Sequence, residues 1–111
     1  MDPSDILLTD RVAIVTGAGQ GIGEGIARGF ARFGARVVVA DKNAETGERT
    51  AAAIRDAGGD ALSIPTDVRD FEQVKAMVDQ TVKRYGRLDI LVNNVGGVRY
   101  ASFLDLGQKG W

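Results

Sequence analysis

The sequence predicts an α/β fold around a parallel sheet, the first half of a doubly wound architecture. Strand-like and helix-like segments alternate along the chain, and the strand-like segments are short apolar runs such as Arg36–Ala40. Such runs are typical of strands that helices cover on both faces. Strands joined by single helices form right-handed βαβ units, so the most economical strand order is 3-2-1-4.

Strands are predicted at residues 12–15, 36–40, 61–64 and 88–92. The first helix carries apolar residues at helical spacing from Ile22 to Phe33 and ends at Gly34. The second begins after the N-cap Asn43 and ends near Gly58. The third follows Asp70, and we expect its apolar stripe to be core: Phe71, Val74, Val78, Val82 and Tyr85.

The composition excludes several classes of site and partner. A net charge of −1, with 26% charged residues, indicates no basic surface for nucleic acid. The absence of cysteine and histidine excludes disulfides and thiolate metal sites, and it removes the usual general base and commonest metal ligand. No apolar run approaches the roughly 20 residues of a membrane span, and the start does not resemble a signal peptide. We therefore expect a cytoplasmic protein with no membrane partner and no metal.

The strongest motif lies at the end of the first strand, where Thr16 is followed by Gly-Ala-Gly-Gln-Gly-Ile-Gly up to Gly23. A glycine-rich turn between a strand and a helix presents backbone N–H groups and the positive helix end at one point, which suits a pyrophosphate. The glycines at 17, 21 and 23 fit G-x-x-x-G-x-G and not G-x-G-x-x-G. A Walker loop is excluded because no Lys-Ser or Lys-Thr pair follows them.

This motif resembles the cofactor signature of the short-chain dehydrogenase/reductase family. Residues 93–96, Asn-Asn-Val-Gly, are similar to the family's Asn-Asn-Ala-Gly motif, with Val95 in place of alanine. Residues 86–89 match the usual approach to that motif, and Asp67-Val68 matches a pair that contacts adenine in the family. The resemblance covers the chain from about residue 8. It implies a Rossmann-like fold in which residues 1–111 form the N-terminal part of an NAD(P)-binding domain.

The resemblance implies dinucleotide contacts at specific residues. Asn94 and Gly96 would line the adenosine ribose, and the added bulk of Val95 affects only its own contact. Thr16 and Asn93 are expected to brace the first and fourth strands. Contacts to the pyrophosphate and its ribose are implied for the glycine motif: Gly17, Gln20, Gly21, Ile22 and Gly23.

Two acidic residues follow the second and third strands. Asp41 stands about 20 residues beyond the glycines, where a carboxylate can bind both ribose hydroxyls of NAD. A 2′-phosphate there would face a like charge, which Lys42 could soften, so NAD is favoured over NADP. The resemblance implies that Asp67 meets the adenine amino group and that Val68 packs beside the ring.

The resemblance also implies chemistry that this sequence does not carry. The family interconverts small alcohols and carbonyls by hydride transfer, with a Tyr-x-x-x-Lys pair in which lysine lowers the tyrosine pKa. Tyr85 is followed four places later by Asp89, and Tyr100 by Leu104, so neither forms the pair. We therefore expect a truncated chain that binds cofactor but does not turn over.

Alternatives exist at each level. The chain could be a non-catalytic nucleotide-binding or interaction module of the same fold, whereas the glycine-rich first turn disfavours a flavodoxin-like domain. The glycine turn could be a plain connection, Asp41 could be only solvated, and Asp67 could only begin a turn or cap a helix. Strand 88–92 would form an apolar sheet edge, and we expect a homo-oligomer through that edge, or marginal stability.

Overall fold

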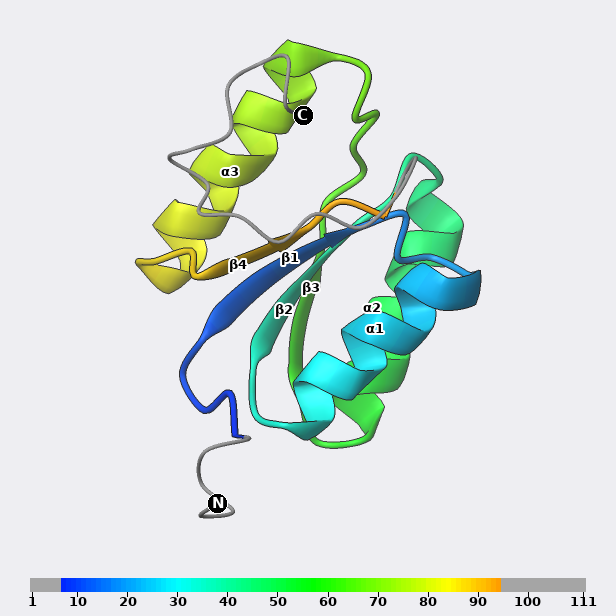
Figure 1. Cartoon of the computed structure of the whole chain (residues 1–111). Helices are drawn as coiled ribbons and strands as arrows, with labels where there is room; N and C mark the ends of the chain where they lie inside the picture. Colours follow the sequence, from blue (N-terminus) through cyan, green and yellow to red (C-terminus); the bar gives the residue numbers. More distant parts are fainter. Residues whose placement is uncertain (1–6, 95–111) are drawn as a thin grey trace.

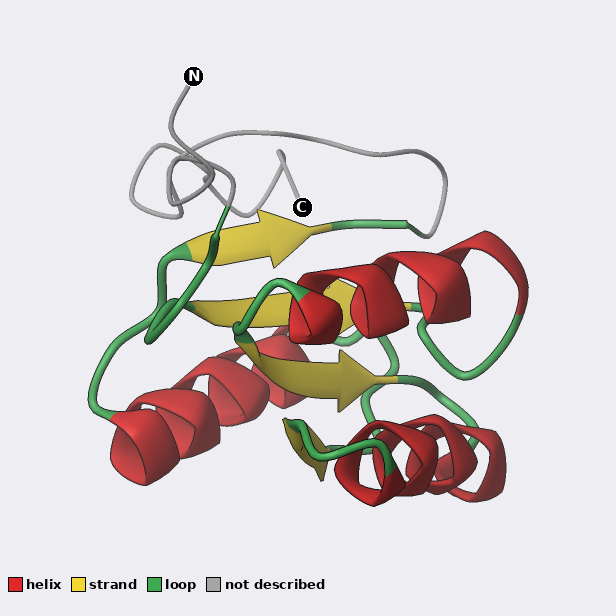
Figure 2. Ribbon diagram, turned by 90° about the horizontal axis from the view of Figure 1, so that it is seen from below, coloured by secondary structure: helices red, strands yellow, loops and turns green. Residues whose placement is uncertain are grey.

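The computed structural model describes residues 7–94 and shows an α/β unit with one four-stranded parallel sheet. The strands are β1 (Val12–Thr16), β2 (Arg36–Ala40), β3 (Asp60–Ser63) and β4 (Ile90–Val92), and their order is β3-β2-β1-β4. Every pair of neighbours is parallel, and the strand arrows that are clearly visible in Figure 2 point the same way. The predicted fold class and the order 3-2-1-4 are therefore confirmed.

In the described part of the chain, three helices cover the sheet. The helices α1 (Gly21–Arg32) and α2 (Ala44–Asp56) lie on one face, and α3 (Phe71–Tyr85) lies on the other (Figure 1). Asn43 caps α2 by accepting from the N–H groups at positions 45 and 46, and Asp70 caps α3 in the same way. Gly86 ends α3 in the left-handed region, with a φ of 80°. None of the helices in the described residues is long and apolar enough to cross a membrane.

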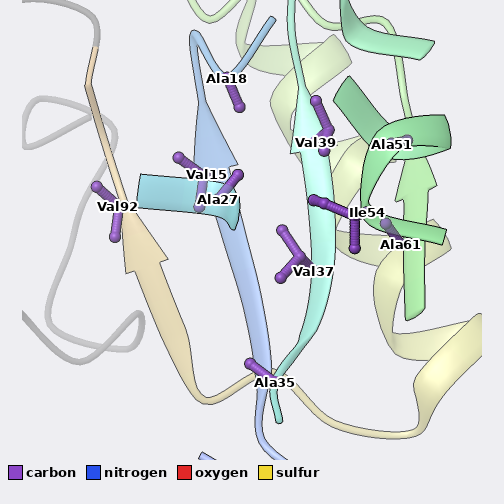
Figure 3. Close-up of a cluster of buried hydrophobic side chains, with 10 residues drawn as sticks. All are labelled: Val15, Ala18, Ala27, Ala35, Val37, Val39, Ala51, Ile54, Ala61 and Val92. Carbon is purple, nitrogen blue, oxygen red and sulfur yellow. The ribbon is translucent and has the colours of Figure 1, made fainter. Parts of the chain in front are cut away.

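Each face of the sheet has its own apolar core, because successive strand side chains point to opposite faces. Val37 and Val39 of β2 point to the face of α1 and α2, where they belong to the same cluster as Ile54 (Figure 3). Val38, between them, belongs to the opposite cluster with Met77 of α3. The sheet is thus buried on both sides, which explains the continuous apolar runs in the sequence.

Two expectations about the apolar residues of α3 are wrong. Phe71 and Val82 are 42% and 44% exposed, although the stripe predicted them as core. The residues that face the sheet are Val74, Met77 and Thr81, with Val78 and Tyr85 packed at the margin of the cluster. The buried stripe is rotated relative to the predicted one, so it includes a methionine and a threonine and leaves Phe71 and Val82 beside it.

The fourth strand is shorter than predicted and begins at Ile90 instead of residue 88. Asp89 still pairs with the start of β1, since its N–H donates to the carbonyl of Val12 at 2.9 Å. The N–H of Val12, however, donates to the Asp89 carboxylate, also at 2.9 Å. The Asp89 carboxylate therefore takes the place of the main-chain carbonyl that would accept from Val12 N–H in a regular parallel ladder. In the described part of the chain β4 pairs with β1 alone, and self-association through its other edge stays a prediction.

Candidate functional site

The turn between β1 and α1 is shaped by glycine. Gly17 and Gly21 both have a φ of 62°, a left-handed conformation that other residues rarely adopt. A Cβ on Gly23 would lie 2.2 Å from the carbonyl oxygen of Gly17 and 2.8 Å from Nδ2 of Asn94. The first turn of α1 therefore packs directly on the loop, with no room for a side chain at position 23.

The N-terminus of α1 differs from those of α2 and α3. Its N-cap, Gln20, makes no side-chain capping bond, and the first hydrogen bond of the helix runs from Glu24 N–H to the Gln20 carbonyl at 3.3 Å. The N–H groups of residues 21–23, in the first turn of the helix, consequently have no partner within the helix. Together with the positive end of the helix dipole, they form a site suited to an anion.

Asp41 follows β2 directly, and its carboxylate is held by two backbone N–H groups. Oδ2 accepts from Gly19 and Oδ1 accepts from Asn43, each at 2.8 Å. The carbonyl of Asp41 also accepts from the N–H of Thr66 at 3.0 Å, which joins the ends of β2 and β3. Asp41 is thus partly buried and oriented, and it is more than a solvated strand-end carboxylate.

Asp67 lies in the turn after β3, and its carboxylate pairs with Arg69. Oδ1 of Asp67 accepts from Nε of Arg69 and Oδ2 accepts from Nη2, both at 3.2 Å. These bonds hold the pKa of the Asp67 carboxyl below its ordinary value, although desolvation opposes them. The carbonyl of Asp67 accepts from Asp70 N–H at 3.0 Å, so this residue does begin the turn before α3. Asp70, not Asp67, caps the helix.

Polar side chains join the ends of β1 and β4. The hydroxyl of Thr16, fully buried, lies 3.1 Å from Oδ1 of Asn93 and 3.3 Å from the carbonyl oxygen of Val92. It accepts from the N–H of Asn94 at 2.9 Å. The amide of Asn94 lies 3.5 Å from the carbonyl oxygen of Gly17. Thr16 and Asn93 therefore link the strands as expected, and Asn94 is drawn to the glycine turn.

The ends of β1, β2 and β3 enclose a cleft of about 340 Å³, within the usual size range of small-molecule sites. We call it the strand-end cleft. Of the predicted site residues, Gly17, Asp41, Asp67 and Val68 line it. The remaining lining residues are Lys42, Thr66 and Arg69, so two acids and two cations face the same space.

Other predicted residues lie beside the strand-end cleft or outside the described chain. Gln20 and Ile22 are exposed at the start of α1, and Ile22 is 75% exposed. Gly21 and Gly23 shape the turn and do not line the cleft. Val95 and Gly96 lie outside the described residues.

Sequence reasoning missed Gly19, Thr66 and Arg69. Gly19 is buried and its N–H binds Asp41, while Arg69 fixes the orientation of the Asp67 carboxylate. Gly19 carried a usable signal, because a glycine within such a turn often marks a close approach of two groups. Nothing in the spacing distinguished Arg69 from a solvated surface charge.

Comparison with known proteins links this geometry to one family. The sequence model of the short chain dehydrogenases matches residues 11–111. The short chain dehydrogenase/reductase astE of Aspergillus oryzae is 52% identical over 88 residues, which cover 78% of this chain and 34% of that protein. An uncharacterized oxidoreductase of Thermotoga maritima is 41% identical over 105 residues, which cover 95% of this chain and 41% of that protein.

A solved structure agrees with these relatives. A 7α-hydroxysteroid dehydrogenase complexed with NADH and 7-oxo glycochenodeoxycholic acid superposes with a TM-score of 0.82 and 38% identity. The match covers 84% of this chain and 36% of that one. The chain thus spans between 34% and 41% of the length of the relatives and the structure compared here.

Proposed function

Because this chain belongs to the short chain dehydrogenase family of oxidoreductases, we propose that it binds NAD across the strand-end cleft and the adjoining glycine turn. The family binds a nicotinamide dinucleotide, and the structure of one relative is a complex with NADH. The observation that carries the proposal is the convergence of Gly17, Asp41, Asp67 and Val68, which come from three separate strand ends, on one cleft. Ligands of open α/β sheets bind at this edge.

The proposed cofactor fits the residues present. The pyrophosphate would sit on the backbone of the turn. Gly23 has no side chain to obstruct it, and Gln20, the N-cap residue, makes no side-chain hydrogen bond to the end of the helix. The adenine would enter the strand-end cleft beside Val68, and its amino group would donate a hydrogen bond to the Asp67 carboxylate. Asn94 would line the adenosine ribose, together with Gly96, which lies outside the described residues.

Asp41 supports NAD over NADP. Its carboxylate is anchored at the cleft by two N–H groups, where it can accept from the two hydroxyls of the adenosine ribose. A 2′-phosphate in the same position would meet a fixed negative charge. Lys42 lines the same cleft and would offset part of this repulsion, so the preference is one of degree.

When bound, the nicotinamide would carry the hydride that interconverts an alcohol and a carbonyl. The part of the chain that the structure describes would bind and orient the dinucleotide. Tyr85 is unsuited to exchange the substrate proton, because burial and a hydrogen bond to Asp60 raise its pKa to about 12. Asp60 is the first residue of β3, and the cleft lies where the strands end. Tyr85 therefore lies at the opposite end of the strands from the cleft. We propose that this chain alone does not turn over substrate.

The alternative is a non-catalytic nucleotide-binding module of the same fold. The relatives named above are described as dehydrogenases or oxidoreductases, which supports the enzyme class over that alternative. Both readings share the dinucleotide site, and they differ only in the chemistry that residues outside this chain would supply. Titration with nucleotide therefore tests the part of the proposal on which both depend.

The test is a calorimetric titration of the 111-residue chain with NAD and with NADP, beside Asp41→Asn and the control Asp79→Asn, an exposed aspartate of α3. NAD should bind saturably and more tightly than NADP. Asp41→Asn should weaken NAD binding roughly tenfold, since a charged acceptor of two hydrogen bonds is lost, and should narrow the gap to NADP. Tighter binding of NADP, or binding of neither nucleotide by a folded chain, would contradict the proposal.

A further inference from the structure

Gly19 ties the glycine turn to the second βα unit through both of its backbone polar groups. Its N–H donates to Oδ2 of Asp41 at 2.8 Å. Its carbonyl accepts from the hydroxyl of Thr50, on α2, at 3.3 Å. Gly19 is buried and Thr50 is 1% exposed, so the bond between them is buried, whereas the bond to Asp41 is partly buried. The position of the Asp41 carboxylate is therefore coupled to the position of the turn.

The contact depends on the absence of a side chain at position 19. A Cβ there would lie 2.6 Å from Oγ1 of Thr46 and 2.7 Å from Oδ2 of Asp41. Gly19 is not among the described glycines with a positive φ, so its backbone conformation is open to alanine. Space alone excludes a methyl group, and an alanine would have to displace the carboxylate of Asp41.

The N–H groups of Gly19 and Asn43 occupy part of the hydrogen-bond acceptor capacity of the Asp41 carboxylate. An ionised carboxylate has about four acceptor sites, two on each oxygen. Oδ2 accepts one bond from Gly19 and Oδ1 accepts one from Asn43, which leaves one site on each oxygen. A vicinal diol donates two hydrogen bonds and matches this pair of sites. The same two bonds prevent the carboxylate from turning away from a 2′-phosphate.

We propose that Gly19 is a positioning residue for dinucleotide selectivity: it holds Asp41 so that the carboxylate accepts a ribose diol and repels a 2′-phosphate, and Thr50 holds Gly19. This inference rests on the proposed NAD site and goes beyond it, because selectivity then depends on a residue that need not touch the ribose. It predicts that selectivity can be changed without altering any charge.

The experiment compares Gly19→Ala and Thr50→Val with matched controls in the 111-residue chain. Gly25→Ala adds a methyl group to α1 where nothing lies within 4 Å, and Thr81→Val removes a buried hydroxyl that bonds within α3. Calorimetry gives the ratio of the dissociation constants for NADP and NAD, and circular dichroism checks the fold. Gly19→Ala should reduce this ratio roughly tenfold and Thr50→Val by a few-fold, whereas both controls should leave it unchanged.

A selectivity readout separates positioning from general damage. In an Asp41→Asn background Gly19→Ala should no longer change the ratio, because the group through which it acts has been altered. An unchanged ratio in folded Gly19→Ala would overturn the inference while leaving the NAD site intact, and so would equal weakening of both nucleotides. If Gly19→Ala does not fold, an unchanged ratio in Thr50→Val overturns it. A folded wild-type chain that binds neither nucleotide contradicts the NAD site, and this inference with it.

Discussion

Gly23 packs against the carbonyl oxygen of Gly17 so closely that a Cβ on Gly23 would lie 2.2 Å away. The helix and the loop that precedes it therefore touch backbone to backbone. This contact brings the uncapped end of α1 to the end of β1, next to Asn94. The shape of the proposed pyrophosphate site thus depends on a residue that need not bond the ligand through any side chain.

Gly23→Ala should therefore damage both the fold and the site. The methyl group would push the turn away from α1, at a cost of about 1–3 kcal/mol of unfolding free energy, and NAD binding should be lost. Urea unfolding and a nucleotide titration measure the two effects. Gly25→Ala, in the same helix with open space around it, should be neutral or stabilising by up to about 1 kcal/mol. Equal behaviour of the two variants would contradict this account of the turn.

Thr16→Val tests the link between β1 and β4. The substitution keeps the shape of the side chain but removes the acceptor for Asn94 N–H and the hydroxyl beside Oδ1 of Asn93. Unfolding free energy should fall by roughly 1–3 kcal/mol, because buried polar groups lose a partner. Thr81→Val, which loses one bond within a helix, serves as the control and should cost about 1 kcal/mol. A Thr16→Val chain as stable as wild type would show that the link carries little weight.

The strand order could be predicted from the sequence because it depends on patterns that extend along the chain. Apolar runs alternate with helical periods, and parallel strands joined by helices allow few topologies. The faces of a helix are harder to predict, as α3 shows. Met77 and Thr81 are buried while Phe71 is exposed, since the angle at which α3 packs on the sheet decides which side is covered.

The candidate site divides in the same way. Gly17, Asp41 and Asp67 each follow a predicted strand, and the carboxyl ends of parallel strands meet at one edge, so their convergence followed from the topology. Hydrogen bonds between a side chain and the backbone of a residue far away in the sequence leave no periodic pattern in that sequence. Gly19 with Asp41, and Thr16 with Asn94, are of this kind and emerge only in three dimensions.

Asp89 makes stability depend on pH at the acidic end. Its side chain is 18% exposed, and hydrogen bonds from Arg87 hold the pKa of the carboxyl below its ordinary value. A lowered pKa in the folded state contributes stability above the unfolded value of about 3.9, and that contribution is lost as pH falls through the folded value. Unfolding free energy should therefore drop as the pH falls below about 4.

Asp89→Asn should flatten that acidic drop, because the asparagine does not titrate. Urea unfolding at a series of pH values measures the slope for wild type, for Asp89→Asn and for Asp79→Asn, whose carboxylate is exposed on α3. Asp79→Asn should keep the wild-type slope. A slope in Asp89→Asn as steep as that of wild type would assign the acid sensitivity to other groups.

Tyr85 makes stability depend on pH at the alkaline end, because its pKa is raised on folding where that of Asp89 is lowered. Burial, and then the hydrogen bond to Asp60 at 2.9 Å, raise the pKa of its hydroxyl to about 12. Its contribution to stability is full below the unfolded value of about 10 and is lost as pH rises toward the folded value. Tyr85→Phe should cost about 0.5–1.5 kcal/mol at neutral pH and should remove this alkaline loss, while NAD affinity stays unchanged. A large fall in NAD affinity would mean that Tyr85 belongs to the site.

The most direct test of the dinucleotide site is a nuclear magnetic resonance titration of the isotope-labelled 111-residue chain with NAD. Amide signals of residues 17–23, 41–42 and 66–69 should shift together with one dissociation constant, because these segments meet at the carboxyl ends of the strands. Signals near Asp60 and Asp89, at the amino ends of the strands, should stay in place. Shifts confined to the amino ends, or no shift in a folded chain at saturating NAD, would contradict the proposed site.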